Sequence, residues 1–211
     1  MTTLKLVIFD CDGVMFDSKE ANRYYYNDLL AHFGHQPMSE DDLEFVHINH
    51  VMGSISHIFR HYQDDMAAVD SFRKSLDYVP YLQYMHMEPD LKEFLQFLQA
   101  NGYQTAISTN RTTTMPIILE MFGLKSFFDM VVTALDVTQP KPHPEALHKI
   151  LERFQVAATE CIYIGDSEID REHTAALGMR LIAFKNNELA AEYHVRSFRE
   201  ISELPIFAAG G

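Results

Sequence analysis

The residues of this chain that could perform chemistry are polar groups at the ends of apolar, strand-like runs. The first run, from Leu4 to Phe9, is followed at once by two carboxylates, Asp10 and Asp12, which lie on either side of Cys11. The polar groups that follow later runs, or the loop beyond one, are Thr109, Asn110, Lys141, Asp166 and Asp170. In a parallel α/β sheet such groups gather beyond the carboxyl ends of the strands. We therefore expect these residues to share one edge of a sheet.

This set of groups suits a metal-assisted reaction of a phosphoryl group. Carboxylates from different loops are the ligands that Mg²⁺ prefers, and a hydroxyl, an amide and an ammonium bind phosphate oxygens. A phosphate monoester dianion beside ionised Asp10 and Asp166 carries a total charge of about -4. Mg²⁺ and Lys141 together return about +3, so the assembly is nearly neutral only when both cations are present. The sequence therefore predicts Mg²⁺ as the cofactor.

The two acids of the first cluster are expected to divide the chemistry between them. Asp10 comes first after the strand and suits in-line attack on phosphorus, which gives a covalent aspartyl-phosphate. Asp12 follows two residues later, at a turn that Gly13 allows, and points to the same face as a general acid and base. Cys11 points away from both and has no base placed for it, so we do not expect a thiol nucleophile.

The arrangement of apolar runs predicts an α/β fold with a Rossmann-like parallel sheet, because short β-rich runs alternate with amphipathic helical patterns. The predicted strands are Leu4 to Phe9, Tyr103 to Ser108, Met130 to Thr133, Cys161 to Ile164 and Arg180 to Phe184. The predicted helices between them are Leu91 to Asn101, Thr113 to Phe122, Pro144 to Phe154 and Ile169 to Leu177. Gly102 and Gly178 fall where a left-handed residue usually ends a helix.

One interval, residues 18–87, interrupts this alternation. It contains no clear β run, and its apolar residues have helical spacing in NRYYYNDLLAHFG, EDDLEFVHINHVMG, ISHIFRHY and MAAVDSFRKSLDYV. We expect these residues to form an inserted, all-helical cap domain, with residues 1–17 and 88–211 forming the α/β core. Tyr24, Tyr25 and Tyr26 are consecutive, so at least one of them must be exposed or face the cleft.

Four motifs, in this order and spacing, resemble those of the haloacid dehalogenase superfamily. They are DCDGV from Asp10, STN from Ser108, KPHPEAL from Lys141 and GDSEID from Gly165. The helical insertion after the first motif is similar to the helical C1-type cap of the phosphatase and β-phosphoglucomutase-like branch. The resemblance extends over nearly the whole chain.

The resemblance implies a role for each matching residue. Asp10 resembles the nucleophile, Asp12 the acid and base, Thr109 the phosphate-binding hydroxyl, Lys141 the lysine of the third motif and Asp166 the metal-binding acid. Asp10, the backbone carbonyl of Asp12 and Asp166 would hold Mg²⁺. Asp170 resembles an acid that supports the metal ligands and is not itself a direct ligand. Asn110 and Arg111, beside Thr109, are further candidates for binding the substrate.

The predicted activity is that of a phosphoric monoester hydrolase acting on a small phosphorylated metabolite. The dehalogenases of the superfamily lack the second acid because they have no alkoxide to protonate, so Asp12 favours phosphoryl transfer. An alternative is a phosphomutase of the β-phosphoglucomutase type, which returns the phosphoryl group to a sugar. A more distant alternative is a non-catalytic signalling module that accepts phosphate on an aspartate.

Composition limits the partners and the location of the protein. The formal net charge is -13, which argues against nucleic acid or an anionic membrane as a partner because either requires a basic face. No run of about eighteen uncharged apolar residues is present. We expect a cytoplasmic monomer in which both cysteines, Cys11 and Cys161, are reduced.

Four histidines of the insertion, His47, His50, His57 and His61, have spacings that would suit a metal. No carboxylate or cysteine in the sequence pattern completes a ligand set, so solvated histidines are the favoured interpretation. A weaker hypothesis places one or two of them on the substrate face of the cap.

Overall fold

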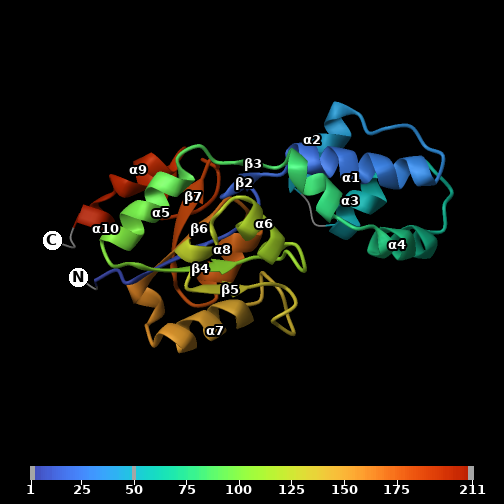
Figure 1. Cartoon of the computed structure of the whole chain (residues 1–211). Coiled ribbons are helices and arrows are strands. Elements are labelled where there is room, and N and C mark those ends of the chain that lie inside the picture. Colours follow the sequence, from blue (N-terminus) through green and yellow to red (C-terminus); the bar gives the residue numbers. More distant parts are fainter. Residues whose placement is uncertain (1–2, 49–50, 209–211) are drawn as a thin grey trace. The chain divides into compact units, whose positions relative to one another are not determined.

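In the computed structural model, which describes residues 3–48 and 51–208, the chain divides into two compact units (Figure 1). The first, the α/β unit, comprises Met1–Phe16 and Met87–Gly211. The second, the helical unit, comprises Asp17–His86. Among the described residues, no helix is both long enough and apolar enough to cross a membrane.

The α/β unit is built on a six-stranded sheet in the order β5-β4-β1-β6-β7-β8, in which every neighbouring pair is parallel. The strands are β1 (Leu6–Phe9), β4 (Gln104–Ser108), β5 (Met130–Val132), β6 (Cys161–Gly165), β7 (Arg180–Phe184) and β8 (Tyr193–Val195). The α/β fold with a Rossmann-like parallel sheet, predicted from the alternating pattern, is confirmed.

The register of the central strands brings their carboxyl ends level. Phe9, the last residue of β1, pairs with Ile107 of β4 on one side and with Ile164 of β6 on the other. The residues that follow these strands therefore emerge at one edge of the sheet. This register explains how side chains more than 150 positions apart in the sequence come together.

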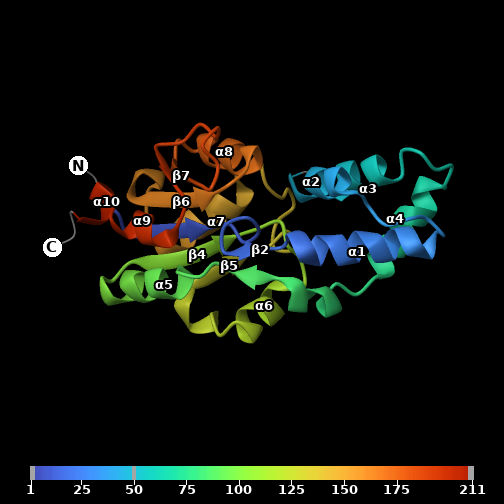
Figure 2. The ribbon, with the colours of Figure 1, turned by 90° about the horizontal axis from the view of Figure 1, so that it is seen from above.

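Helices cover both faces of the sheet (Figures 1 and 2). On one face lies α7 (Glu145–Phe154), whose buried residues include Leu147, and on the same side lies α8 (Glu168–Ala175). The other face carries α5 (Leu91–Ala100) and α9 (Phe198–Ser202). There Phe9 lies 6.1 Å, between ring centroids, from both Phe94 and Phe198. The unit also contains α6 (Met115–Met121), α10 (Pro205–Ala208) and the 3₁₀ helices η2 (Lys125–Phe127) and η3 (Ala158–Glu160).

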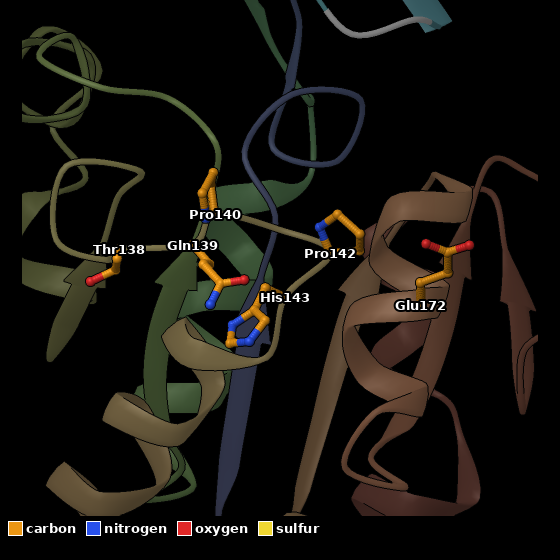
Figure 3. Close-up of a pocket in the computed structure, with 6 residues that line it drawn as sticks. All are labelled: Thr138, Gln139, Pro140, Pro142, His143 and Glu172. Carbon is orange, nitrogen blue, oxygen red and sulfur yellow. The ribbon is translucent and has the colours of Figure 1, made fainter.

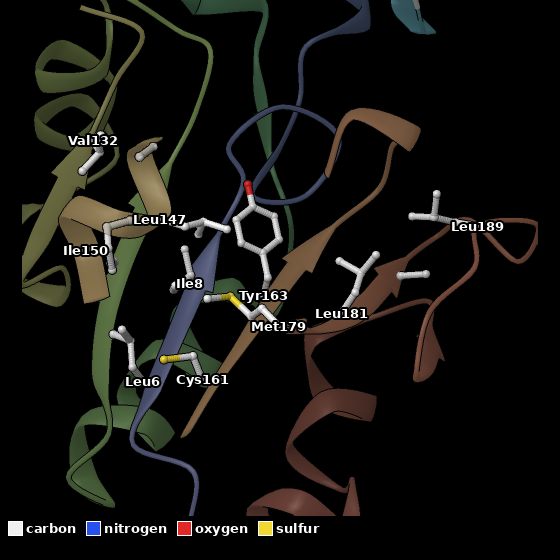
Figure 4. Packing of buried hydrophobic residues seen from close by; sticks show 13 residues of the cluster. Leu6, Ile8, Val132, Leu147, Ile150, Cys161, Tyr163, Met179, Leu181 and Leu189 are labelled. Atoms are coloured by element: carbon white, nitrogen blue, oxygen red, sulfur yellow. The ribbon is translucent and has the colours of Figure 1, made fainter. Parts of the chain in front are cut away.

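The apolar cluster on the α7 face is shown in Figure 4, where side chains of several strands interlock with Leu147 and Ile150. Tyr163 of β6 lies within this cluster, with its ring among apolar side chains, and its hydroxyl group donates a hydrogen bond to the carbonyl of Ser108 at the end of β4. The core therefore extends directly to the edge where the polar groups emerge.

The predicted elements of the α/β unit are confirmed, with ends that differ by at most two residues. Gly102 and Gly178 have positive φ angles of 74° and 60°, as expected for residues that end helices. The sequence analysis missed β8 and α9. Both are short, and the three residues of β8 are too few for an alternating pattern to be recognised.

The helical unit contains α1 (Lys19–His32), α2 (Glu40–Ile48), α3 (Val51–Ile58), α4 (Met66–Ser75) and the 3₁₀ helix η1 (Val79–Tyr84). Tyr25 and Tyr26 are buried whereas Tyr24 is exposed, as their consecutive positions require. The chain enters this unit through β2 (Phe16–Asp17) and leaves it through β3 (His86–Met87), and these two short strands pair with each other.

We expect Leu147→Ala to lower the free energy of unfolding by about 2–5 kcal/mol, because it creates a cavity beneath α7. Leu135 is 64% exposed, so the matched change Leu135→Ala should cost less than about 0.5 kcal/mol. Urea denaturation of both variants measures the difference. Equal, small losses would contradict the packing of α7 against the sheet.

Candidate active site

The centre of the site is a buried lysine shared by two aspartates. Lys141 Nζ lies 2.8 Å from Asp10 Oδ1 and 2.7 Å from Asp170 Oδ1. It also donates a hydrogen bond to the hydroxyl of Tyr163 at 3.0 Å. All four side chains are buried. The three protons of the ammonium group therefore each have an acceptor, which fixes the position of Lys141.

Asp170 is held in place by the first turn of α8. Its Oδ2 accepts hydrogen bonds from Ser167 Oγ at 2.8 Å and from the backbone N–H groups of Asp166 and Ser167. Ser167 caps the helix in return, because its Oγ accepts from the backbone N–H of Asp170. Both carboxylate oxygens of Asp170 are engaged within the protein, and the residue therefore supports Lys141.

Asp10 follows β1, and its backbone N–H donates to the carbonyl of Ile164 at 3.0 Å, which continues the pairing of β1 with β6. Asp166 follows β6, and its backbone carbonyl accepts from the side-chain amide of Asn186 at 2.8 Å. The two acids are thus placed by the ends of neighbouring strands.

Burial is the largest influence on the pKa values of the acids in the site. Burial raises the pKa of Asp10 to about 7, although Lys141 acts in the opposite direction. Burial, and then repulsion by Asp10, raise the pKa of Asp166 to about 8. For Asp170, burial is outweighed by Lys141 and by hydrogen bonds, so its pKa is lowered. Burial alone would lower the pKa of Lys141, but Asp10 and Asp170 raise it well above its usual value.

These acids match the donor set of a hard cation. Asp10, Asp166 and Asp170 each offer an oxygen atom within 4.8 Å of the others, and they form the sole such group among residues 3–48 and 51–208. Because the oxygens of Asp170 are already engaged, Asp10 and Asp166 are the carboxylates that fit a metal ion. Oxygen donors with excess negative charge suit Mg²⁺.

Asp12 and Arg111 form a bidentate ion pair, in which each carboxylate oxygen accepts one hydrogen bond. Arg111 Nε donates to Asp12 Oδ2 at 2.7 Å, and Nη2 donates to Oδ1 at 2.6 Å. Arg111 Nη1 also donates to Thr114 Oγ1 at 3.2 Å. The side chain of Arg111 is 10% exposed and that of Asp12 is 39% exposed. Arg111, expected as a contact of the substrate, therefore holds the carboxylate of the predicted general acid in this structure.

Asn110 binds the main chain of Lys141 in both directions. Its Nδ2 donates to the carbonyl of Lys141 at 3.1 Å, and its Oδ1 accepts from the N–H of Lys141 at 3.0 Å. Thr109 is buried, and its Oγ1 accepts from the N–H of Arg111 at 3.1 Å. The side chain of Asn110, expected to contact substrate, thus positions the loop that carries Lys141, here called the lysine loop. Thr109 lies beside Asn110 at the end of β4.

Gly13 allows the loop after β1 to approach the loop after β6. Its φ angle is +75°, and a Cβ atom at this position would lie 2.1 Å from Asp166 Oδ2. Only glycine leaves room for the carboxylate of Asp166 here.

The thiol of Cys11 does not take part in this network of acids. Cys11 is fully buried, and burial, followed by the nearby charge of Asp12, raises the pKa of its thiol well above the usual value. A thiolate nucleophile at this position is disfavoured, in agreement with the sequence analysis.

Tyr163 and Ser167 were missed by the sequence analysis. Tyr163 accepts a hydrogen bond from Lys141, and its hydroxyl lies 2.9 Å from the carbonyl of Ser108 and 3.1 Å from Asp170 Oδ1. One signal in the sequence could have identified it. A tyrosine in the run CIYIG, two residues before the glycine that ends β6, carries a hydroxyl into an otherwise apolar strand that leads to the site.

Outside the site, a shallow pocket is lined by residues that flank the lysine loop and by one residue of α8 (Figure 3). Its lining residues are Thr138, Gln139, Pro140, Pro142, His143 and Glu172. None of the predicted site residues lines this pocket, so we do not identify it with the active site.

The histidines of the helical unit singled out in the sequence do not form a common cluster among the described residues. His57 Nε2 lies 3.0 Å from Asp42 Oδ1, and among the described residues neither His47, His57 nor His61 belongs to a group that could hold a metal. His50 lies outside the described residues.

The fold and the arrangement of acids at the strand ends define a hydrolase of the haloacid dehalogenase type. The chain belongs to the haloacid dehalogenase-like hydrolase family, whose family model matches residues 7–184. This range runs from β1 to the end of β7, and the family predicted from the four motifs is confirmed.

Known proteins similar to the chain agree with this assignment. The crystal structure of a haloacid dehalogenase superfamily hydrolase of subfamily IA from Geobacter sulfurreducens matches with a TM-score of 0.82 and 36% identity, over 95% of each chain. A phosphoglycolate phosphatase from Vibrio parahaemolyticus is 28% identical over 79% of this chain and 77% of its own. The pyrophosphatase PpaX from Bacillus mycoides is 29% identical over 79% and 77% of the two chains. The predicted class of enzyme, a hydrolase of the phosphatase type, is confirmed.

We expect Gly13→Ala to lower turnover of a phosphate ester by about 10²-fold, because the new methyl group displaces Asp166 by about an ångström. Gly178→Ala is the matched control, since Gly178 also has a positive φ, of +60°, but has no atom within 4 Å of the added Cβ. Both changes cost about 1–2 kcal/mol in backbone strain. Measurement of kcat and of urea stability separates the two effects, and equal kcat values would contradict the close approach of the two loops.

Proposed function

We propose that the chain removes phosphate from a small phosphorylated metabolite in a Mg²⁺-dependent reaction that passes through an aspartyl-phosphate on Asp10. The observation that supports this most directly is the buried Asp10 carboxylate at the end of β1, bonded at 2.8 Å to Lys141 and adjacent to Asp166. We also propose the helical unit as the cap that selects the substrate and the monomer as the active form.

In the first step the carboxylate of Asp10 attacks phosphorus, and the bond from phosphorus to the leaving oxygen breaks. Lys141 keeps the carboxylate oriented and offsets negative charge that would otherwise oppose the approach of two anions. Thr109 binds a phosphoryl oxygen through its hydroxyl group. Asp10, Asp166 and the backbone carbonyl of Asp12 would hold Mg²⁺, which supplies the remaining positive charge when bound.

Asp12 moves the protons of both steps. In its protonated form it gives a proton to the leaving alkoxide, and afterwards it accepts a proton from the water that attacks the aspartyl-phosphate. This second attack returns Asp10 and releases inorganic phosphate. The two hydrogen bonds from Arg111 fix the plane of the Asp12 carboxylate and favour its ionised form, so Arg111 must release at least one oxygen of Asp12 before this residue carries the proton. The curated relatives are named as phosphatases, which supports hydrolysis over the phosphomutase alternative.

We expect Asp10→Asn to lower the turnover of an aryl phosphate in the presence of Mg²⁺ by more than about 10³-fold, because an amide cannot form the covalent intermediate. Asp41→Asn, which removes the same charge from an exposed position of α2, should leave kcat unchanged. Intact-mass measurement of rapidly quenched samples should detect a phosphorylated form of the native chain but not of Asp10→Asn. Near-native turnover by this variant would contradict the mechanism.

Removal of divalent cations with a chelator should abolish phosphate release, and addition of Mg²⁺ should restore it. Asp166→Asn should raise the Mg²⁺ concentration needed for half-maximal activity, because it removes one of two carboxylate donors. A Mg²⁺ titration of both chains measures the shift. Full activity after chelation would show that the acids do not serve a metal.

A further inference from the structure

A buried histidine of α8, His173, lies beside the site but has no part in the proposed chemistry. Its Nε2 lies 3.1 Å from the hydroxyl oxygen of Ser108, the last residue of β4, and both residues are fully buried. In the sheet, β1 lies between β4 and β6, so α8, which follows β6, reaches past one strand to make this contact. The contact therefore joins α8 to the strand end that directly precedes Thr109.

The imidazole of His173 is uncharged at neutral pH. Burial, and next the positive charge of Lys141, lower its pKa to about 4. Its Nδ1 makes no hydrogen bond of normal geometry among the described residues, although the main chain of Pro142 and His143 faces the ring closely enough to raise the pKa. An apolar side chain would serve packing better here, because a buried polar group with incomplete hydrogen bonding costs free energy.

The peptide group that joins Ser108 to Thr109 is held at both ends. Its carbonyl accepts a hydrogen bond from the hydroxyl of Tyr163 at 2.9 Å, and its N–H donates to the carbonyl of Val132 at 3.1 Å. The rings of His173 and Tyr163 meet edge to face, with centroids 5.8 Å apart and an angle of 82° between their planes. His173 thus contacts both the side chain of Ser108 and the residue that binds its carbonyl.

Tyr163 can donate to only one of two acceptors, because its hydroxyl carries a single proton. That hydroxyl lies 2.9 Å from the carbonyl of Ser108 and 3.1 Å from Asp170 Oδ1, and it accepts from Lys141 at 3.0 Å. The tilt of the ring decides which acceptor receives the proton. Because His173 lies against this ring, its removal would let Tyr163 turn toward Asp170 and release the carbonyl of Ser108.

The direction of the Thr109 hydroxyl depends on this peptide group. Thr109 Oγ1 accepts from the N–H of Arg111 at 3.1 Å, so its own proton is the one it can offer to a phosphoryl oxygen. A shift of the Ser108–Thr109 peptide would turn that proton away from the substrate, and small misplacements of this kind reduce rates strongly.

We propose that His173 is a positioning residue, which fixes the end of β4 so that the hydroxyl of Thr109 faces the phosphoryl group of the substrate. It acts through its contacts with Ser108 and Tyr163. The inference rests on the proposed phosphatase function and adds a supporting residue to it. In this assignment α8 supports the site twice, through Asp170 and, three residues later on the same face of the helix, through His173.

Two substitutions of similar size separate the hydrogen bond from the packing. His173→Gln can place an amide group where Nε2 lies, whereas His173→Leu cannot bond to Ser108. For an aryl phosphate we expect His173→Leu to lower kcat/KM by about tenfold and His173→Gln by less than about threefold. Ser108→Ala removes the other partner and should resemble His173→Leu, so it tests the same contact if His173→Leu does not fold.

The control is Thr174→Val, which removes a buried hydroxyl from the next position of α8. Thr174 Oγ1 bonds to the carbonyls of Asp170 and Arg171 in the same helix. This change should leave kcat/KM unchanged. Urea denaturation of every variant gives the folded fraction, by which the rates are corrected.

The effect of His173 should disappear in a chain that lacks the hydroxyl of Thr109. In a Thr109→Val background, His173→Leu should lower kcat/KM by less than about twofold, because both changes remove the same interaction with phosphate. A role in packing alone would give the same loss in both backgrounds.

A measurement that needs neither metal nor substrate tests the contact itself. In the metal-free chain at about pH 7, ¹⁵N NMR of the histidine side chains should show His173 as a neutral imidazole. Its signals are those that are missing from His173→Gln. Ser108→Ala should shift the signal of Nε2, because it removes the hydroxyl bonded to that nitrogen.

Three results would overturn the inference. They are equal kcat/KM values of folded His173→Leu and His173→Gln, an undiminished loss in the Thr109→Val background, and an Nε2 signal that Ser108→Ala leaves in place. Failure of the proposed function is distinguishable, because the native chain with Mg²⁺ would then not turn over the aryl phosphate at all. The inference would fall with it, even if NMR showed the contact of His173 with Ser108.

Discussion

The site depends on one buried ammonium group. Lys141 is joined to Asp10 from the end of β1, to Asp170 from the first turn of α8 and to the hydroxyl of Tyr163 from β6. Removal of one partner from such a buried ion pair leaves an uncompensated charge, which typically costs about 3–5 kcal/mol. Three separate segments must therefore reach their native positions together, and the pairing of β1 with β6 is what aligns them.

The pairing of β1 with β6 also keeps Asp10 and Asp166 close despite their mutual repulsion. The backbone positions of Asp10 and Asp166 are fixed by strands that the apolar core holds in register. The two carboxylates therefore cannot separate to reduce the repulsion between them. Burial is the largest cause of the raised pKa of both groups, and for Asp166 repulsion by Asp10 raises the pKa further. The favourable free energy of packing in the core thus offsets the unfavourable concentration of negative charge at the edge of the sheet.

The parts of the fold that could be predicted are those with a local signal. Apolar runs followed by acids identified β1 and β6, and the order of the four motifs identified the edge at which Asp10, Lys141 and Asp166 meet. The partners of the polar groups could not be predicted in this way. Arg111 and Asn110 were expected to face a substrate, but whether such a side chain points outward or bonds to Asp12 or a neighbouring loop depends on tertiary geometry. Tyr163 looked like an ordinary strand residue, because its role appears only when the end of β6 is placed beside Lys141.

The pairing of β2 with β3 determines which changes of the chain the α/β unit can tolerate. The two short strands bring the exit and the return of the chain side by side, so the α/β unit keeps its strand order whatever lies between Asp17 and His86. An insertion with adjacent ends is tolerated well, because its length places no strain on the surrounding structure. We therefore expect changes in the sequence, size or surface charge of the intervening helices to leave the geometry of the residues after β1, β4 and β6 unchanged. Related chains of this design are expected to diverge in what they bind faster than in the reaction they perform.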